Sequence, residues 1–256
     1  TNGCAMYVFS ATTNAPQVDD WGTLVDVAQD MRIHASSVLY LFSHPTNGAS
    51  ALLRINNLTI AGSGTINADS GGYIGKSQAK GWGPGGGSGS HLAAAGYGGK
   101  GGGSAGTPGG VYGSSNAPTA PGSAGGAHTS AGYPGGAGGG LVRVEAGEGV
   151  SISGTITADG ASTGPASSSG GGSGGGVYIR CRTFTGSAGV IRTRGGGGSY
   201  SGGGGGRIAV WRMVDSSSGV TANATNGYVA TDTTIPDPGT IVWGWIPFQG
   251  TLFMMQ

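Results

Sequence analysis

The chain has 256 residues, a formal net charge of +1, 9% charged residues and 60 glycines. An average protein has about 7% glycine and about 25% charged residues, so this composition is atypical of globular enzymes. The small net charge excludes an electrostatic case for nucleic-acid binding, and no apolar run reaches the ~18 residues of a membrane-spanning helix.

Residues 1–20 form the first predicted unit, an N-terminal apolar segment. Aromatic, branched and sulfur-containing side chains follow one another in its centre, and such a run favours a β-strand. These side chains have no obvious partner within the segment, so we expect them to form an assembly interface. The residues concerned are Met6, Tyr7, Val8 and Phe9.

The next stretch, residues 21–35, fits either a short capping helix or two strand arms with alternating apolar residues. We favour strands because the alternation has a period of two. A third arm is predicted over residues 38–42. It ends at residues 43–48, where proline and an Asn-Gly pair are typical of a tight turn.

From residue 51 onward the sequence repeats one unit. Each copy has an alternating apolar strand next to glycines and a short polar turn, and the first three add a second strand opened by glycine. Two strand arms at one spacing predict two sheets wound around one core. We therefore expect an all-β fold, a parallel β-helix (β-solenoid) over residues 21–242. The copies read ALLRINNLTIAGSGTINADSGG, GGGLVRVEA…SGTITADG, GGGVYIRCRTF…AGVIRTRGG and GGGRIAVWRM.

A long glycine-rich insertion separates the first two copies. Glycine makes up 26 of the 66 residues from 75 to 140. A structureless loop of this length would argue against a compact domain. The glycine spacing instead predicts ordered, extended polyglycine-like segments that lie against each other or along the sheets.

The last unit, residues 243–256, is an apolar tail. A solvated terminus would not carry so many large apolar side chains, so we expect the tail to cap the last coil or to dock on another chain. The predicted interface residues of this tail are Trp243, Trp245, Phe248, Leu252, Phe253 and Met254.

The strings GGGSGGGVYIRCRTF and GGGGGRIAVWR, with WGTLVDVAQDMRIHASS before them, resemble the glycine-rich parallel β-helix segments of large secreted and surface proteins of Planctomycetes–Verrucomicrobia–Lentisphaerae-type bacteria. The likeness covers residues 21 to about 242. It implies a parallel β-helix fold and an extracellular or cell-surface location, and it implies no catalytic residue. The chain departs from those proteins in its apolar tail, where they continue into further domains.

The strongest candidates for chemistry are two aspartates at equivalent places in the repeat, Asp69 and Asp159. On adjacent coils they would lie close enough to bind calcium or to act as an acid and base pair. The alternative, which we favour, is turn chemistry, with Arg194 at the third equivalent place avoiding a stack of like charges. The four histidines share no metal-ligand spacing, so no metal and no cofactor is predicted.

Aromatic residues punctuate the glycine-rich segments. Their rings either stack on sugars or cover glycine backbone, and the second role is the more common one. The candidate glycan contacts are Trp82, Tyr97, Tyr112 and Tyr133.

Two further pairs of residues have chemical potential. Asn57 and Asn223 begin Asn-X-Thr sequons, which are glycosylation acceptors in secreted proteins. Cys4 and Cys181 are the only cysteines, so they allow at most one disulfide, and Cys181 also fits the apolar face of its strand.

Three functions fit these patterns. The first is an extracellular structural protein, not an enzyme, whose subunits bind one another head to tail through their apolar ends in a filament or surface layer. The second is an adhesin that binds glycans through its glycine-rich loops, similar in composition to the glycine-rich adhesins of phage tail fibres. The third is a polysaccharide lyase or glycosidase, which the scarcity of charged residues disfavours.

Overall fold

A computed structural model describes residues 3–12, 20–77, 80–88, 93–103, 105–128, 132–164, 168–198, 200–229 and 234–247. These residues form fourteen β-strands and no helix, so the expected all-β class is correct. Every pairing between strands is parallel.

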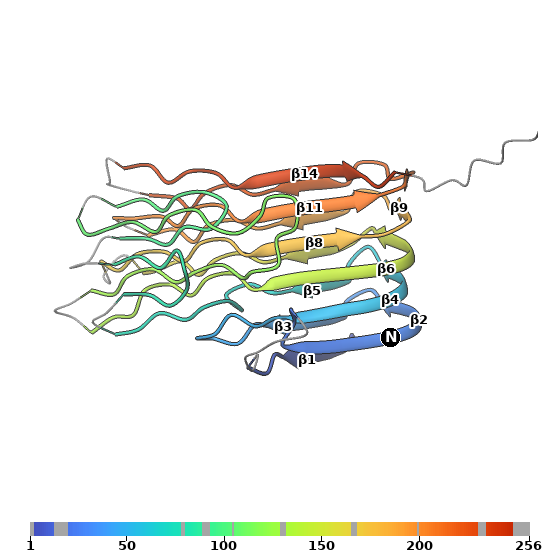
Figure 1. Cartoon of the computed structure of the whole chain (residues 1–256), viewed down its shortest axis with the longest axis horizontal. Coiled ribbons are helices and arrows are strands. Elements are labelled where there is room, and N and C mark those ends of the chain that lie inside the picture. Colours follow the sequence, from blue (N-terminus) through green and yellow to red (C-terminus); the bar gives the residue numbers. More distant parts are fainter. Residues whose placement is uncertain are drawn as a thin grey trace, which may run out of the picture.

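The strands form two sheets. The chain crosses from one sheet to the other at most connections, and Figure 1 shows the strands as successive layers from β1 to β14. The six-stranded sheet contains, in spatial order, β1 (Ala5–Phe9), β3 (Val38–Phe42), β5 (Thr65–Asn67), β7 (Thr155–Thr157), β10 (Val190–Arg192) and β13 (Thr221–Asn223). The eight-stranded sheet contains β2 (Thr23–Ile33), β4 (Ala51–Ile60), β6 (Leu141–Ile152), β8 (Gly176–Arg180), β11 (Arg207–Arg212) and β14 (Thr240–Trp245), with β9 (Thr183–Thr185) beside the end of β6 and β12 (Val214–Asp215) beside β9.

This arrangement corrects the prediction of a β-solenoid. The strands belong to two separate parallel sheets of six and eight strands that lie side by side. A regular parallel β-helix would wind in coils of similar length, whereas the connections here range from the single residue 213 to residues 68–140. The long connections leave the sheets and bond to one another, so they do not close a uniform coil (Figure 1).

The repeat itself is visible in the strand register. The second arms align at Thr65, Thr155 and Val190, as the sequence repeats predict. Residues 21–35 contribute one strand, β2, whose register against β4 shifts between Val27 and Asp30. A bulge of this kind explains why the apolar alternation changes phase within the stretch.

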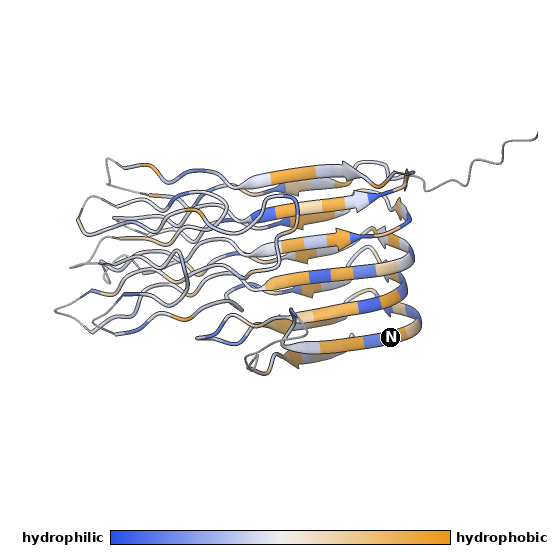
Figure 2. Ribbon diagram, in the orientation of Figure 1, coloured by the Kyte–Doolittle hydropathy of each residue, from blue (hydrophilic) through white to orange (hydrophobic). Residues whose placement is uncertain are grey.

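The hydrophobic core lies between the facing sheets. Its members recur at every second position along the strands, which is the period-two pattern of the sequence, and on β4, β6 and β11 several of the residues between them are buried as well. Figure 2 shows these apolar positions on the strands and few in the glycine-rich segments. Fully buried examples are Leu39, Ile66, Ile156 and Ile191 from one sheet and Leu53, Val144, Ile179 and Val210 from the other.

The glycine-rich segments lie beside the sheets and are hydrogen-bonded to one another, and we call this region the glycine bundle (Figure 1). Residues 93–96 illustrate its organisation. The amides of Ala94, Ala95 and Gly96 donate to carbonyls of Gly102, Gly171 and Gly85, and the carbonyls of Ala93, Ala94 and Ala95 accept from the amides of Gly126, Gly109 and Gly204. Each bond goes to a different segment, as expected for an extended chain with about three residues per turn and no internal hydrogen bonds.

Glycine is required in the bundle because the backbones approach one another closely. A Cβ atom on Gly172 would overlap the carbonyl oxygen of Ala137, whereas a Cβ atom on Gly110 would have nothing within 4 Å. The predicted polyglycine-like packing of the insertion is therefore what the backbone geometry shows, and it extends to residues 168–176 and 200–206.

The bundle predicts opposite outcomes for two glycine substitutions. Gly172→Ala should lower the free energy of unfolding by at least about 2 kcal/mol, because the methyl group forces two backbones apart. Gly110→Ala should change it by less than about 1 kcal/mol, since the methyl group points into open space. Chemical denaturation of both variants measures the difference, and equal effects would contradict close packing in the bundle.

Candidate functional site

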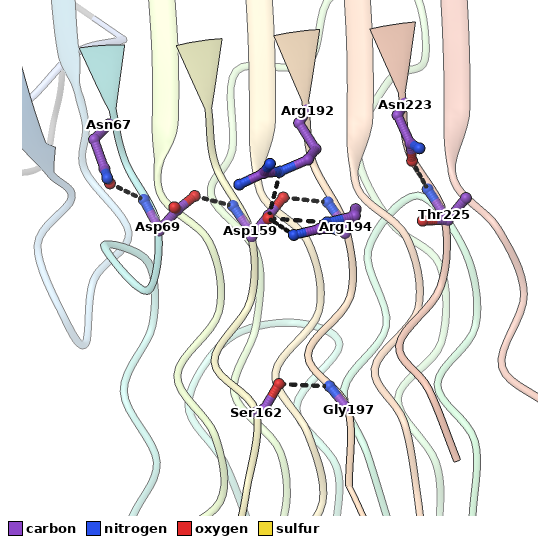
Figure 3. Close-up of polar contacts among 9 residues, drawn as sticks. All are labelled: Asn67, Asp69, Asp159, Ser162, Arg192, Arg194, Gly197, Asn223 and Thr225. Carbon is purple, nitrogen blue, oxygen red and sulfur yellow. Dashed lines mark hydrogen bonds and ion pairs between the residues drawn. The ribbon is translucent and has the colours of Figure 1, made fainter. Parts of the chain in front are cut away.

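A column of polar side chains lies where the strands of the six-stranded sheet end and the chain enters the glycine bundle (Figure 3). Asn67 Oδ1 accepts a hydrogen bond from the amide of Asp69 at 2.8 Å. Asp69 Oδ1 accepts from the amide of Asp159 at 2.7 Å, and Asp159 Oδ1 accepts from the amide of Arg194 at 2.7 Å. Each carboxylate thus binds the backbone of the next layer.

Two arginines converge on the second oxygen of Asp159. Asp159 Oδ2 lies 2.7 Å from Nε of Arg192 and 3.0 Å from Nη2 of Arg194. The Asp159 side chain is 13% exposed and that of Arg194 is 47% exposed. Charge-assisted hydrogen bonds of this kind are about twice as strong as neutral ones, so they hold both guanidinium groups in place.

The two aspartates have different electrostatic surroundings. Burial raises the pKa of Asp69 above its usual range, and the nearby charge of Asp159 adds to this effect. Asp159 has two arginine partners, whereas Asp69 has backbone and side-chain partners but no ion pair among the described residues. Asp69 and Asp159 lie on adjacent layers, an order that the sequence left open, and their contacts are those of turn stabilisation, the interpretation that the sequence favoured.

A groove of about 660 Å³ runs beside this column. Three consecutive layers line it, because its residues follow β7, β10 and β13. The lining combines an exposed cation, hydroxyl groups, an amide and an aromatic ring. The polar and aromatic side chains are Asp159, Ser162, Thr163, Arg194, Thr225, Asn226 and Tyr228.

One end of the stacked sheets is formed by β1 and β2, which are edge strands. Tyr7 is 56% exposed and Phe9 is 67% exposed, although their rings stack on Tyr40 and Phe42 at 4.8 Å between centroids. Met6 is 53% exposed, and Val8 is buried in the core. The predicted N-terminal interface residues therefore form an edge strand that is apolar and largely accessible.

The opposite end is formed by β13 and β14. Trp243 and Trp245 belong to β14, so the apolar tail contributes to the last strand instead of starting after it. Trp243 contacts the Phe184 ring edge-on at 5.8 Å, and Trp245 lies 4.3 Å from the guanidinium of Arg212. Trp243 remains 37% exposed and Trp245 57% exposed. Phe248, Leu252, Phe253 and Met254 lie outside the described residues.

The predicted glycan-contacting aromatics are scattered. Tyr97 is fully buried against Tyr112 and Arg207, so its ring is not available to a glycan. Tyr112 donates a hydrogen bond to the carbonyl of Pro121. These two rings wedge glycine segments together, as the alternative interpretation of the sequence proposed.

The other two rings are more accessible. Trp82 is partly buried, with the Lys76 ammonium 3.7 Å above its ring. Tyr133 is 49% exposed. The structure does not bring the four candidates together in one surface groove.

The remaining candidates occupy separate places. Asn57 lies on β4 and donates a hydrogen bond to Asp30, while Asn223 is exposed on the edge strand β13. Cys4 is exposed and Cys181 is buried, and both are free thiols, so the disulfide considered from the sequence is not formed. Among the described residues there is no cluster of metal-ligating side chains.

The groove residues Ser162, Asn226 and Tyr228 are not singled out by the sequence analysis. A signal was present, because TADGAST, TRGG and NATNGY follow the short second strands at corresponding places. It was missed because the residues at these corresponding positions differ in type from copy to copy.

Comparisons with protein-family models, curated proteins and solved structures found no match for this chain. Within the described ranges, no helix has the length and apolar character needed to cross a bilayer. The function must therefore be argued from the geometry of the chain itself.

The two equivalent aspartates predict opposite effects of the same substitution. Asp159→Asn should lower the free energy of unfolding by about 1–2 kcal/mol, because it leaves two partly exposed arginines without their counter-charge. Asp69→Asn should leave the stability at pH 7 unchanged or slightly higher, since the amide keeps the acceptor oxygen and removes a poorly solvated charge. Denaturant unfolding at pH 7 measures both.

The pH dependence provides a second measurement for Asp69. Because its folded-state pKa is raised, the wild type gains stability relative to Asp69→Asn as the pH falls through that pKa. The difference between the two proteins should therefore shrink in acid. A stabilising effect of Asp69→Asn that grows on acidification would contradict the assignment.

Proposed function

We propose that this chain is a structural subunit that assembles head to tail outside the cell. The observation that carries the proposal is the pair of open sheet ends, β1 with β2 and β13 with β14, at which β1 and β14 expose large apolar side chains. Each of these four strands has a strand neighbour on one side only, as does the two-residue strand β12, whereas the other strands are paired on both sides. Unpaired parallel edges with exposed aromatic residues favour strand addition.

The strand register indicates how two copies would fit. Val25, Val144 and Trp243 belong to one column of paired positions across the eight-stranded sheet. A second copy that continues this column places Trp243 of one copy opposite Val25 of the next. By the same rule Ala222 of β13 comes opposite Met6 of β1.

The chemistry of the two ends is compatible with this register. Val25 and Val27 of β2 are partly buried against the core, and Met6, which lines a small pocket with Met31 and Ile33, is half exposed. Apolar side chains at both ends would be buried when the core of one copy continues into the next. Burial of apolar surface is the main driving force in most protein association. Because the contact joins different surfaces, it need not close, and it produces a filament.

The extracellular location and the absence of catalysis are parts of the same proposal. The resemblance to glycine-rich segments of secreted and surface proteins supports the location. The ion pairs that engage Asp159 support a structural role for the polar column. A glycan on Asn223 would occupy the docking edge, so glycosylation at that sequon and head-to-tail docking exclude one another.

Trp245→Glu should prevent assembly. The substitution removes an exposed apolar side chain from β14. It also places a carboxylate next to Gly244, and Gly244 lies opposite Asp26 of the next copy in the proposed register, so two negative charges would come close together. Within the subunit, Arg212 is close enough to pair with the new carboxylate, so the fold should be retained. Negative-stain electron microscopy and light scattering should show filaments for the wild type and monomers for the variant.

Tyr133→Glu is the matched control, because Tyr133 is a similarly exposed aromatic residue in the glycine bundle. It should assemble like the wild type. A wild-type protein that stays monomeric at high concentration, or a Trp245→Glu protein that forms unchanged filaments, would overturn the proposal.

A further inference from the structure

We propose that the groove beside the polar column binds a saccharide that carries carboxylate groups. The groove lies along the junction of the six-stranded sheet and the glycine bundle, and three consecutive layers line it. Its axis therefore follows the stacking direction, and it is open to solvent along its length. This shape suits an extended chain molecule better than a compact cofactor.

The accessible charge in the groove is positive. Asp159 is 13% exposed, and its two oxygens already accept hydrogen bonds from Arg192 and Arg194. Arg194 is 47% exposed, and its Nη1 group has no partner among the described residues. A fixed guanidinium with a free donor edge is well suited to a carboxylate ligand.

An aromatic ring lines the groove from the layer of β13. Tyr228 is 76% exposed, the second-highest exposure among the exposed large hydrophobic residues. Its backbone is held, because the carbonyl of Tyr228 accepts from the amide of Gly198 at 3.0 Å. An amphipathic ring on an anchored backbone offers an apolar face together with a polar hydroxyl group, which is what a sugar ring needs for stacking.

Besides the cation and the ring, the lining of the groove contains hydroxyl and amide groups. Thr225 and Asn226 follow β13, and Ser162 and Thr163 follow β7. Ser162 Oγ accepts from the amide of Gly197 at 2.9 Å, which fixes its position and leaves its proton available (Figure 3). Such donors and acceptors match sugar hydroxyl groups.

Isothermal titration calorimetry tests this inference with uronate trisaccharides. The probes are the trimers of galacturonate, glucuronate and mannuronate, each paired with its neutral hexose trimer. At least one uronate trimer should bind with a stoichiometry of one, and its neutral counterpart should bind about 10-fold more weakly, because a charge-assisted hydrogen bond is lost.

Two variants locate the binding in the groove. Arg194→Gln should weaken the binding of the uronate about 10-fold and should erase most of the preference over the neutral trimer. Tyr228→Ala should weaken both trimers by a similar factor, since it removes the stacking surface and no charge. Arg182→Gln is the matched control on an exposed residue outside the groove, and it should bind like the wild type.

The inference fails if no uronate trimer binds, if the neutral trimers bind equally well, or if Arg182→Gln weakens binding as much as Arg194→Gln. A measurement of filament formation distinguishes saccharide binding from assembly. Filament formation by Tyr228→Ala should match the wild type, because Tyr228 follows the docking strand β13 and is not part of it.

Discussion

The close approach of glycine backbones is the constraint on which the rest of the structure depends. Extended segments in the bundle contact one another through amides and carbonyls, without side chains between them. Ordering a glycine costs roughly 0.5–1 kcal/mol more than ordering an alanine in regular structure. The hydrogen bonds to several neighbouring segments offset this cost, so the bundle is stable only as a whole.

The bundle and the sheets are joined by a small number of polar and aromatic side chains. Arg207 of β11 donates hydrogen bonds to the carbonyls of Tyr112 and Tyr97 and to the hydroxyl of Thr240. Ser123 donates its hydroxyl proton to Tyr112 and accepts a hydrogen bond from the amide of Gly85. Buried polar groups with specific partners fix the register of the glycine segments relative to the strands, which glycine alone cannot do.

Much of the strand layer was predictable because its side chains carry a pattern. The strand at residues 38–42 and the short second arms at Thr65, Thr155 and Val190 follow from alternation and repetition. The closure of these strands into a solenoid was wrong, since the repeat describes neighbouring strands and not the path of the long connections. The hydrogen bond between Gly72 and Gly138 could not be predicted, because a residue without a side chain gives no sequence signal of which segment it contacts.

The candidate site was predictable in part. The equivalent places of Asp69 and Asp159 follow from the repeat, but the adjacency of their layers does not, because the long insertion lies between them. The burial of Tyr97 and the position of Tyr228 in the groove depend on how the glycine segments fold back. The two ends of the sheets were anticipated as apolar, but the inclusion of Trp243 in β14 was not.

The layered hydrogen bonding has a mechanical consequence. Tension along the stacking direction would load the bonds between two neighbouring layers in both sheets and in the bundle at the same time, for example between β7 and β10 and between Gly174 and Gly204. Bonds that share a load side by side rupture together and not one after another. Material built from such layers would be stiff and would break abruptly, with little gradual extension before failure.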